Sequence, residues 1–209
     1  MKGLLIKDFY QMCRHCRAFL LIVVLFAVLS ALEDTSLFIA LYPALFSGMI
    51  PVSLLSYDER SGWSEYSGTL PYTKSQLVSC KYILGLAIEL AVVLICALAQ
   101  WIRFSRYGAL EGISFSAVTG MLVLMGFFST GVSLPFMYKC GVEKGRIVYY
   151  VVLGVGCAAS VLISDLVESG RVFVTVNGDL FAMCCLAGAA FYALSWYLAT
   201  VWYKKRDGA

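Results

Sequence analysis

Charged side chains are scarce in this chain of 209 residues: they make up 14% of it, against about 25% in soluble domains. Hydrophobic residues make up 61% of the sequence instead, and the mean hydropathy is +0.83. A water-soluble domain with this composition would not have enough polar groups to cover its surface. The deficit therefore excludes a disordered chain, a nucleic-acid-binding domain and a soluble enzyme, and it predicts an integral membrane protein.

Histidine is nearly absent, because His15 is the only one in the chain. It lies at the predicted membrane surface, so no Ser/His/Asp catalytic set can be assembled around it. Cys13 and Cys16 have C-x-x-C spacing, but a metal site would need two further ligands nearby. The phosphate-binding loop of ATPases is also missing, since its nearest counterpart, 143–146, lacks the glycine-rich turn. We therefore expect no catalytic residue, metal site or bound cofactor in this chain.

Long apolar segments dominate the sequence. A bilayer core about 30 Å thick requires roughly 20 helical residues to cross it. The apolar runs are continuous rather than alternating, which favours helices over the strands of a membrane barrel. The sequence therefore predicts an all-α membrane protein with six transmembrane helices in one domain. They are expected at 18–32, 37–57, 78–101, 113–138, 147–163 and 180–203.

The distribution of basic residues predicts the orientation. If the N-terminus is cytoplasmic, thirteen of the sixteen Lys and Arg residues lie on the inside. Only Arg103, Arg106 and Arg171 then lie outside, and lysine and arginine are normally enriched in cytoplasmic loops. We therefore expect both termini in the cytoplasm, with 204–209 as a short cytoplasmic tail.

The first 17 residues are patterned like an amphipathic helix. Four apolar residues recur at helical spacing on one face, namely Leu5, Phe9, Met12 and Cys16. Polar and basic residues, among them Lys7 and Arg14, occupy another face. This pattern predicts an interfacial helix before the first span. A solvated chain end is the alternative, and the segment is too long for the charged region of a signal peptide.

A polar segment, 58–76, separates the second and third predicted spans. Three apolar residues repeat there at i, i+3 and i+7, namely Trp63, Tyr66 and Leu70. Three acidic residues share the segment, namely Asp58, Glu59 and Glu65. We predict a short acidic helix that ends before Pro71, followed by a Thr73–Gln76 capping box. The helix could pack on lipid headgroups, but acidic residues suit anionic lipid poorly, which favours a protein partner.

Residues 57–82 resemble the segment that follows the second span in permease subunits of type-2 ABC exporters. The similar residues are Tyr57-Asp58-Glu59-Arg60, Gly62-Trp63, Tyr66, Thr69-Leu70-Pro71, Lys74 and Lys81-Tyr82. Within that family, the chain is most similar to the small stand-alone permeases of the phenol-soluble modulin exporter group. The layout of the whole chain fits the family, although the outside loop 165–179 is very short.

The resemblance implies a cytoplasmic coupling helix that contacts a cognate ATPase, on which ATP and Mg would bind. The residues that it assigns to this contact are Asp58, Glu59, Trp63, Glu65, Tyr66 and Leu70. It further implies a homodimer of permeases with two ATPase subunits, in a bacterial plasma membrane. The implied cargo is amphipathic cytolytic peptides such as phenol-soluble modulins.

Glu89 is the only acidic residue inside a predicted span. It lies near the bilayer midplane, where an ionised carboxylate costs about 2.5–3.5 kcal/mol on insertion scales. Glu89 either lines the substrate pathway or hydrogen-bonds a neighbouring hydroxyl, for instance that of Ser129, Ser133 or Tyr192. Two other functions remain open: an ion-coupled transporter that uses Glu89, and a non-transporting membrane sensor or immunity protein.

Overall fold

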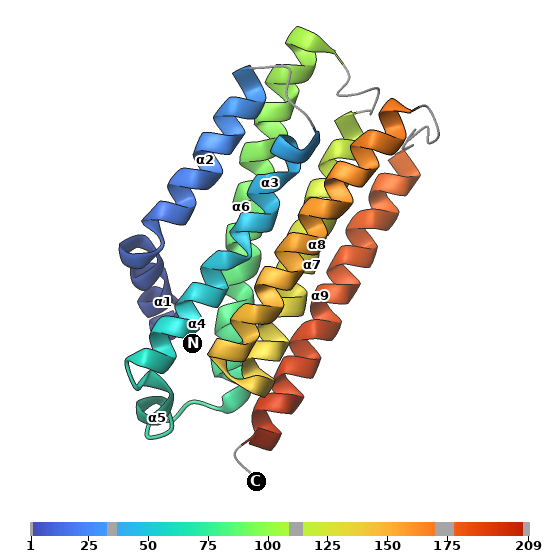
Figure 1. The fold of residues 1–209 in the computed structure, drawn as a ribbon. Coiled ribbons are helices and arrows are strands. Elements are labelled where there is room, and N and C mark those ends of the chain that lie inside the picture. The colour runs from blue at the N-terminus through green and yellow to red at the C-terminus, as the bar shows by residue number, and fades with distance from the viewer. Residues whose placement is uncertain (1, 33–36, 109–114, 170–177, 207–209) are drawn as a thin grey trace.

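The computed structural model describes residues 2–32, 37–108, 115–169 and 178–206 (Figure 1). In this part of the chain all regular secondary structure is helical, as predicted. The helices are α1 (Lys2–His15), α2 (Arg17–Leu32), α3 (Leu37–Ser47), α4 (Met49–Arg60), α5 (Trp63–Ser67), α6 (Lys74–Tyr107), α7 (Phe115–Cys140), α8 (Val142–Glu168) and α9 (Gly178–Arg206).

The long helices run side by side as an elongated bundle (Figure 1). In this bundle α7 contacts α3, α6, α8 and α9. The short helices α1 and α5 lie at one end, where α9 also finishes (Figure 1). The chain therefore brings its N-terminal helix, the α4–α6 connection and the end of its last helix together, and we call this the inner end.

Within the residues that the structure describes, four helical stretches are long and apolar enough to cross a membrane, namely Ile39–Arg60, Lys74–Tyr107, Phe115–Cys140 and Phe181–Lys205. The pair α1 and α2, bent by 70°, makes a fifth candidate. The segment 147–163 lies in α8, which packs against α3 and α7 but does not belong to this set. A multi-pass helical protein is thus confirmed, whereas six spans and cytoplasmic termini remain predictions.

The predicted N-terminal helix is present as α1, and one of its faces packs against the bundle. Leu4, Asp8 and Met12 are its buried residues, whereas Phe9 is 52% exposed. Asp8 faces the bundle because it forms an ion pair with Lys81 of α6. Apolar residues of α1 therefore remain on the outer side of the helix, where Ile6 and Tyr10 accompany Phe9.

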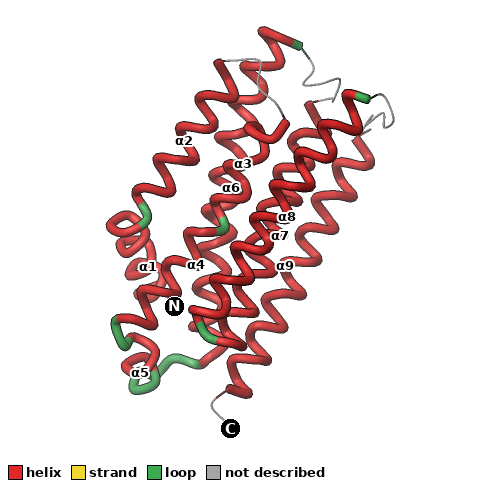
Figure 2. The backbone as a smooth tube through the Cα atoms, in the orientation of Figure 1, coloured by secondary structure: helices red, strands yellow, loops and turns green. Residues whose placement is uncertain are grey.

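The predicted second span consists of α3 and α4, with a short interruption at Gly48 (Figure 2). Proline lacks an N–H group, so Pro51 cannot donate the helical hydrogen bond to the carbonyl of Ser47. This missing bond accounts for an interruption one turn before the proline. The span also continues to Arg60, three residues beyond its predicted end.

Candidate functional site

The segment predicted as one acidic helix is divided between two helices. Asp58 and Glu59 belong to the last turn of α4, and Gly62, with a φ of 68°, follows the end of that helix. The short helix α5 then covers only Trp63–Ser67, so Leu70 lies in the turn that follows it. The single helix was therefore wrong, because the left-handed conformation at Gly62 breaks it.

The start of α6 agrees with the prediction. The Thr73 hydroxyl accepts a hydrogen bond from the backbone N–H of Gln76, at 3.3 Å. The backbone N–H of Thr73 donates to the Gln76 side chain at 3.0 Å. This reciprocal capping box is confirmed, and it fixes where the α5–α6 connection enters the bundle.

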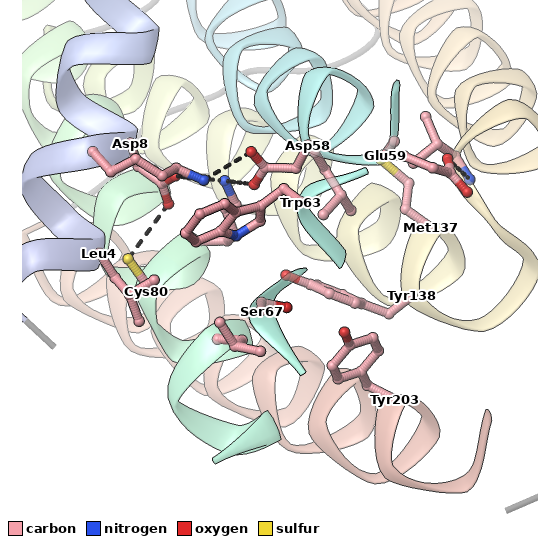
Figure 3. Close-up of a pocket in the computed structure, with 15 residues that line it drawn as sticks. Leu4, Asp8, Asp58, Glu59, Trp63, Ser67, Cys80, Met137, Tyr138 and Tyr203 are labelled. Atoms are coloured by element: carbon pink, nitrogen blue, oxygen red, sulfur yellow. Dashed lines mark hydrogen bonds and ion pairs between the residues drawn. The ribbon is translucent and has the colours of Figure 1, made fainter. Parts of the chain in front are cut away.

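Four charged side chains from three helices form an ion-pair cluster at the inner end (Figure 3). Lys81 of α6 lies 2.8 Å from Asp8 of α1 and 2.5 Å from Asp58 of α4. Lys7 of α1 lies 3.0 Å from Asp8 and 2.8 Å from Asp58. We call these residues, Lys7, Asp8, Asp58 and Lys81, the inner cluster. Each carboxylate contacts both ammonium groups, so the cluster balances its own charge.

The inner cluster is largely withdrawn from solvent. The side chains of Asp8, Asp58 and Lys81 are 3%, 8% and 6% exposed, and that of Lys7 is 27% exposed. Burial alone would raise the pKa of Asp8, but the charges of Lys81 and Lys7 outweigh it and lower that pKa. Asp58 therefore faces inward to the cluster, and Asp8 is held as an anion.

The aromatic residues of α5 differ in their accessibility. The Lys7 ammonium lies 4.1 Å from the centre of the Trp63 ring, a distance typical of a cation–π contact. Trp63 is half-buried, and its ring centre lies 5.6 Å from that of Tyr66. Tyr66 itself is 58% exposed. Tyr66 is thus open to a partner, whereas Trp63 joins α5 to the inner cluster.

Glu59 connects the end of α4 with the beginning of α8. The backbone N–H of Val142, the first residue of α8, donates to Glu59 Oε2 at 3.3 Å. A carboxylate at a helix N-terminus interacts favourably with the helix dipole and with its unpaired N–H groups. The Glu65 side chain, which the sequence also assigned to the coupling contact, lies outside the described residues.

A cavity of about 370 Å³ lies beside the inner cluster (Figure 3). Apolar residues such as Leu4 and Met137 line it together with the cluster and Trp63. Tyr138 and Tyr203 also line it, with ring centres 5.2 Å apart. The inner end therefore has a hollow beside the place where α1, α4, α5 and α6 meet.

Glu89 is buried within the bundle, with 2% of its surface exposed. Ser47 Oγ lies 2.5 Å from Glu89 Oε2, so the hydroxyl partner belongs to α3. The predicted partners Ser129 and Ser133 instead bind the carbonyl oxygens of Leu45 and Ser129, at 3.3 and 2.6 Å. Glu89 is not among the residues that line the cavity at the inner end, and its place in a substrate pathway stays a prediction.

Sequence reasoning missed three members of the inner cluster, Lys7, Asp8 and Lys81. Lys81 follows the predicted start of the third span by three residues, and a charge at such a depth usually has a partner. The depth of Lys81 in the span was the available signal, but no local sequence pattern pairs it with Asp8, 73 positions away. Among the described residues, no group of three or more metal-binding side chains comes together.

Comparison with protein families shows which family the chain belongs to. A family model described as "ABC-2 family transporter protein" matches residues 3–204. Comparisons with curated proteins and with solved structures gave no match. The family match covers all the described helices except the first residue of α1 and the last two of α9, so it supports the permease resemblance for the chain as a whole and implies a partner ATPase subunit. The chain belongs to the ABC-2 transporter family as a membrane permease.

Proposed function

We propose that this chain is the membrane-spanning subunit of an ATP-driven exporter of amphipathic, membrane-active peptides such as phenol-soluble modulins. ATP and Mg bind to a separate ATPase subunit, because the chain has no phosphate-binding loop. Two copies of the chain form the pathway in a bacterial plasma membrane, with one ATPase under each copy. The substrate and the homodimer rest on the resemblance of residues 57–82.

The observation that carries this proposal is the construction of the inner end around α5. Tyr66 is exposed on this short helix, at the end of the bundle where α9 also finishes. An exposed aromatic residue beside a half-buried one is a suitable anchor for a protein partner, because aromatic residues often dominate interface energies. The ATPase therefore contacts α5 and the exposed turn residues that flank it.

The contacts of α4 and α5 provide a route by which movement of the ATPase reaches the spans. Trp63 contacts Lys7 of α1, and Asp58 pairs with Lys81 of α6. Glu59 holds the N-terminus of α8. A displacement of α5 together with the adjoining end of α4 therefore acts on three other helices, α1, α6 and α8. This connectivity favours a transporter driven from its inner end over a sensor that only sequesters peptides.

The outer surface of the bundle suits a lipid environment and apolar cargo. The described part of α9 leaves most of its apolar surface outside the bundle, with Leu186 71% and Leu194 57% exposed. On the other side, Leu21 of α2 is 70% exposed. Such faces contact lipid or a second copy of the chain. Amphipathic peptides partition into the same region of the membrane, which gives them access to the transporter from the inner leaflet.

Co-purification tests this proposal. The tagged chain, expressed with its cognate ATPase, should copurify with that ATPase, and amphipathic peptide should stimulate ATP hydrolysis after reconstitution. Tyr66→Ala should weaken the association, whereas Tyr10→Ala is a matched control because Tyr10 is an exposed tyrosine on α1. If the chain transports peptide without an ATPase and responds to pH, it is an ion-coupled transporter. If it binds peptide without moving it, it is a sensor or immunity protein.

A further inference from the structure

The Ser47 hydroxyl lies within hydrogen-bond distance of two oxygen atoms, but it has only one hydrogen to donate. Ser47 Oγ is 2.7 Å from the carbonyl oxygen of Ala44 and 2.5 Å from Glu89 Oε2. A serine hydroxyl carries one hydrogen, and a peptide carbonyl can only accept. Serines in helices commonly donate to a backbone carbonyl of the preceding turn. If Ser47 donates to Ala44 in this way, the hydrogen between Ser47 Oγ and Glu89 Oε2 must be bonded to Glu89 Oε2.

The surroundings of Glu89 agree with a neutral carboxyl group. Its second oxygen, Oε1, is buried and has no hydrogen-bond partner among the described residues. An ionised carboxylate would place half of its charge on that unpartnered oxygen, whereas the carbonyl oxygen of a protonated acid loses far less without a partner. Gly126 of α7 makes room for this oxygen, because a Cβ atom at position 126 would lie 1.5 Å from it.

We propose that Glu89 is protonated and acts as a positioning residue, because its hydrogen bond to Ser47 links the second span to the third. Its Oε2–H group donates to Ser47 Oγ, and Ser47 donates in turn to the carbonyl of Ala44. The hydrogen bond between Glu89 and Ser47 lies at the interruption of the second span, since Ser47 is the last residue of α3 and Gly48 separates it from α4.

The position of this bond gives it an influence on the inner end. At the same interruption α3–α4 approaches α7 closely, because a Cβ atom on Gly48 would lie 2.3 Å from Ser129 Oγ. From there α4 leads directly to Asp58 and Glu59. Glu89 therefore fixes the point from which the α4 segment extends to the inner cluster. This inference does not depend on the cargo or on the ATPase.

Infrared difference spectroscopy of the full chain in lipid vesicles tests the protonation directly. Subtracting the Glu89→Gln spectrum from the wild-type spectrum should reveal the C=O stretching band of a protonated carboxyl group. In Ser47→Ala the same band should move to higher frequency, because the acid loses its hydrogen-bond acceptor. Ser53→Ala, a serine of α4, is the matched control and should leave the band in place.

Thermal unfolding supplies a second readout. Glu89→Gln should unfold at the wild-type temperature, since the amide N–H₂ group can donate to Ser47 as the acid does. Glu89→Ala and Gly126→Ala should both unfold at a lower temperature, because one removes the donor and the other displaces it. Absence of a protonated-carboxyl band from the wild type would overturn the proposal. A melting temperature of Glu89→Gln as low as that of Glu89→Ala would also overturn it.

Discussion

The ammonium group of Lys81 lies 2.8 Å from a carboxylate oxygen of Asp8, although 73 residues separate them in the sequence. The pair joins the N-terminal helix to the third span, and both side chains are almost fully buried. Lys81 also lies 2.5 Å from Asp58, so this one cation holds carboxylates from α1 and α4. The N-terminal helix is therefore held by ion pairs to α4 and α6 beside α5, and it is not a separate surface element.

Removing Lys81 should be strongly destabilising. In Lys81→Met the side chain keeps most of its volume, but Asp8 and Asp58 lose a shared buried partner. Removal of one member of a buried ion pair costs about 3–5 kcal/mol. We expect a clear fall in the melting temperature of the reconstituted protein, whereas the exposed Lys144→Met should behave as wild type. The double variant Lys81→Met with Asp8→Asn should recover part of the loss, and strict additivity would argue against the pair.

Tyr66 and Trp63 should respond differently to truncation. Tyr66→Ala should reduce ATPase association by about 2 kcal/mol or more, as for a buried aromatic anchor, and leave the melting temperature unchanged. Trp63→Ala should also lower the melting temperature, because Trp63 lines the cavity and contacts Lys7. Pull-down and thermal unfolding of the same preparations separate the two effects. If the two variants lose the same ATPase association and the same stability, Tyr66 is not a partner contact distinct from the structural role of Trp63.

Glu59 should matter for the connection between α4 and α8. Glu59→Ala removes the acceptor at the N-terminus of α8, which is worth about 0.3–1 kcal/mol for a charge at that position. We expect a small loss of stability, near-normal ATPase association, and less peptide exported per ATP hydrolysed. Glu59→Gln keeps an acceptor and should fall between Glu59→Ala and the wild type. If Glu59→Ala exports as much peptide per ATP hydrolysed as the wild type, the hydrogen bond from Val142 to Glu59 does not take part in transmitting movement from the ATPase to the spans.

Acid should weaken the inner cluster in a defined range of pH. The pKa of Asp8 is below its ordinary value of 3.8, so the folded state binds this proton less readily than the unfolded state. The stabilisation is complete above about pH 3.8 and is lost as the pH falls through the lowered value. Melting temperatures measured as the pH is lowered from neutral through and below 3.8 should fall less in Asp8→Asn than in the wild type. The exposed Asp165→Asn is the control and should keep the wild-type acid dependence.

The orientation can be tested with an impermeant thiol reagent on intact cells. In a cysteine-free background, a cysteine at Ser105, exposed near the end of α6, should react from outside. A cysteine at Thr69, exposed after α5, should react only after permeabilisation. These outcomes follow from the excess of basic residues at the inner end. Labelling at Thr69 with protection at Ser105 would invert the topology.

Much of the fold follows from local sequence patterns. Continuous apolar runs predict the long helices, and the Thr73–Gln76 capping box correctly predicts where α6 begins. The break at Gly62 was missed because a glycine in a polar segment does not reveal the sign of its φ angle. The sequence did not show that Asp8 faces the bundle, because its partner, Lys81, lies on another helix.

The candidate site was only partly predictable, because ion pairs between distant helices leave no local pattern. The sequence pointed to the segment that contains Trp63 and Tyr66, and it contained no indication that Asp58 faces inward to Lys7 and Lys81. Glu89 was singled out by its charge in an apolar span. Its partner, Ser47, depends on which faces of α3 and α6 meet, which is a property of the packed bundle.

Uptake of a labelled amphipathic peptide into inside-out vesicles tests the central claim most directly. The vesicles contain the chain with its ATPase, and the energy source is either ATP or an imposed proton gradient. The account predicts accumulation with ATP alone, its loss with a non-hydrolysable ATP analogue, and a strong reduction in Tyr66→Ala at equal expression. Accumulation driven by the proton gradient without ATP, or full ATP-driven uptake in Tyr66→Ala, would contradict it.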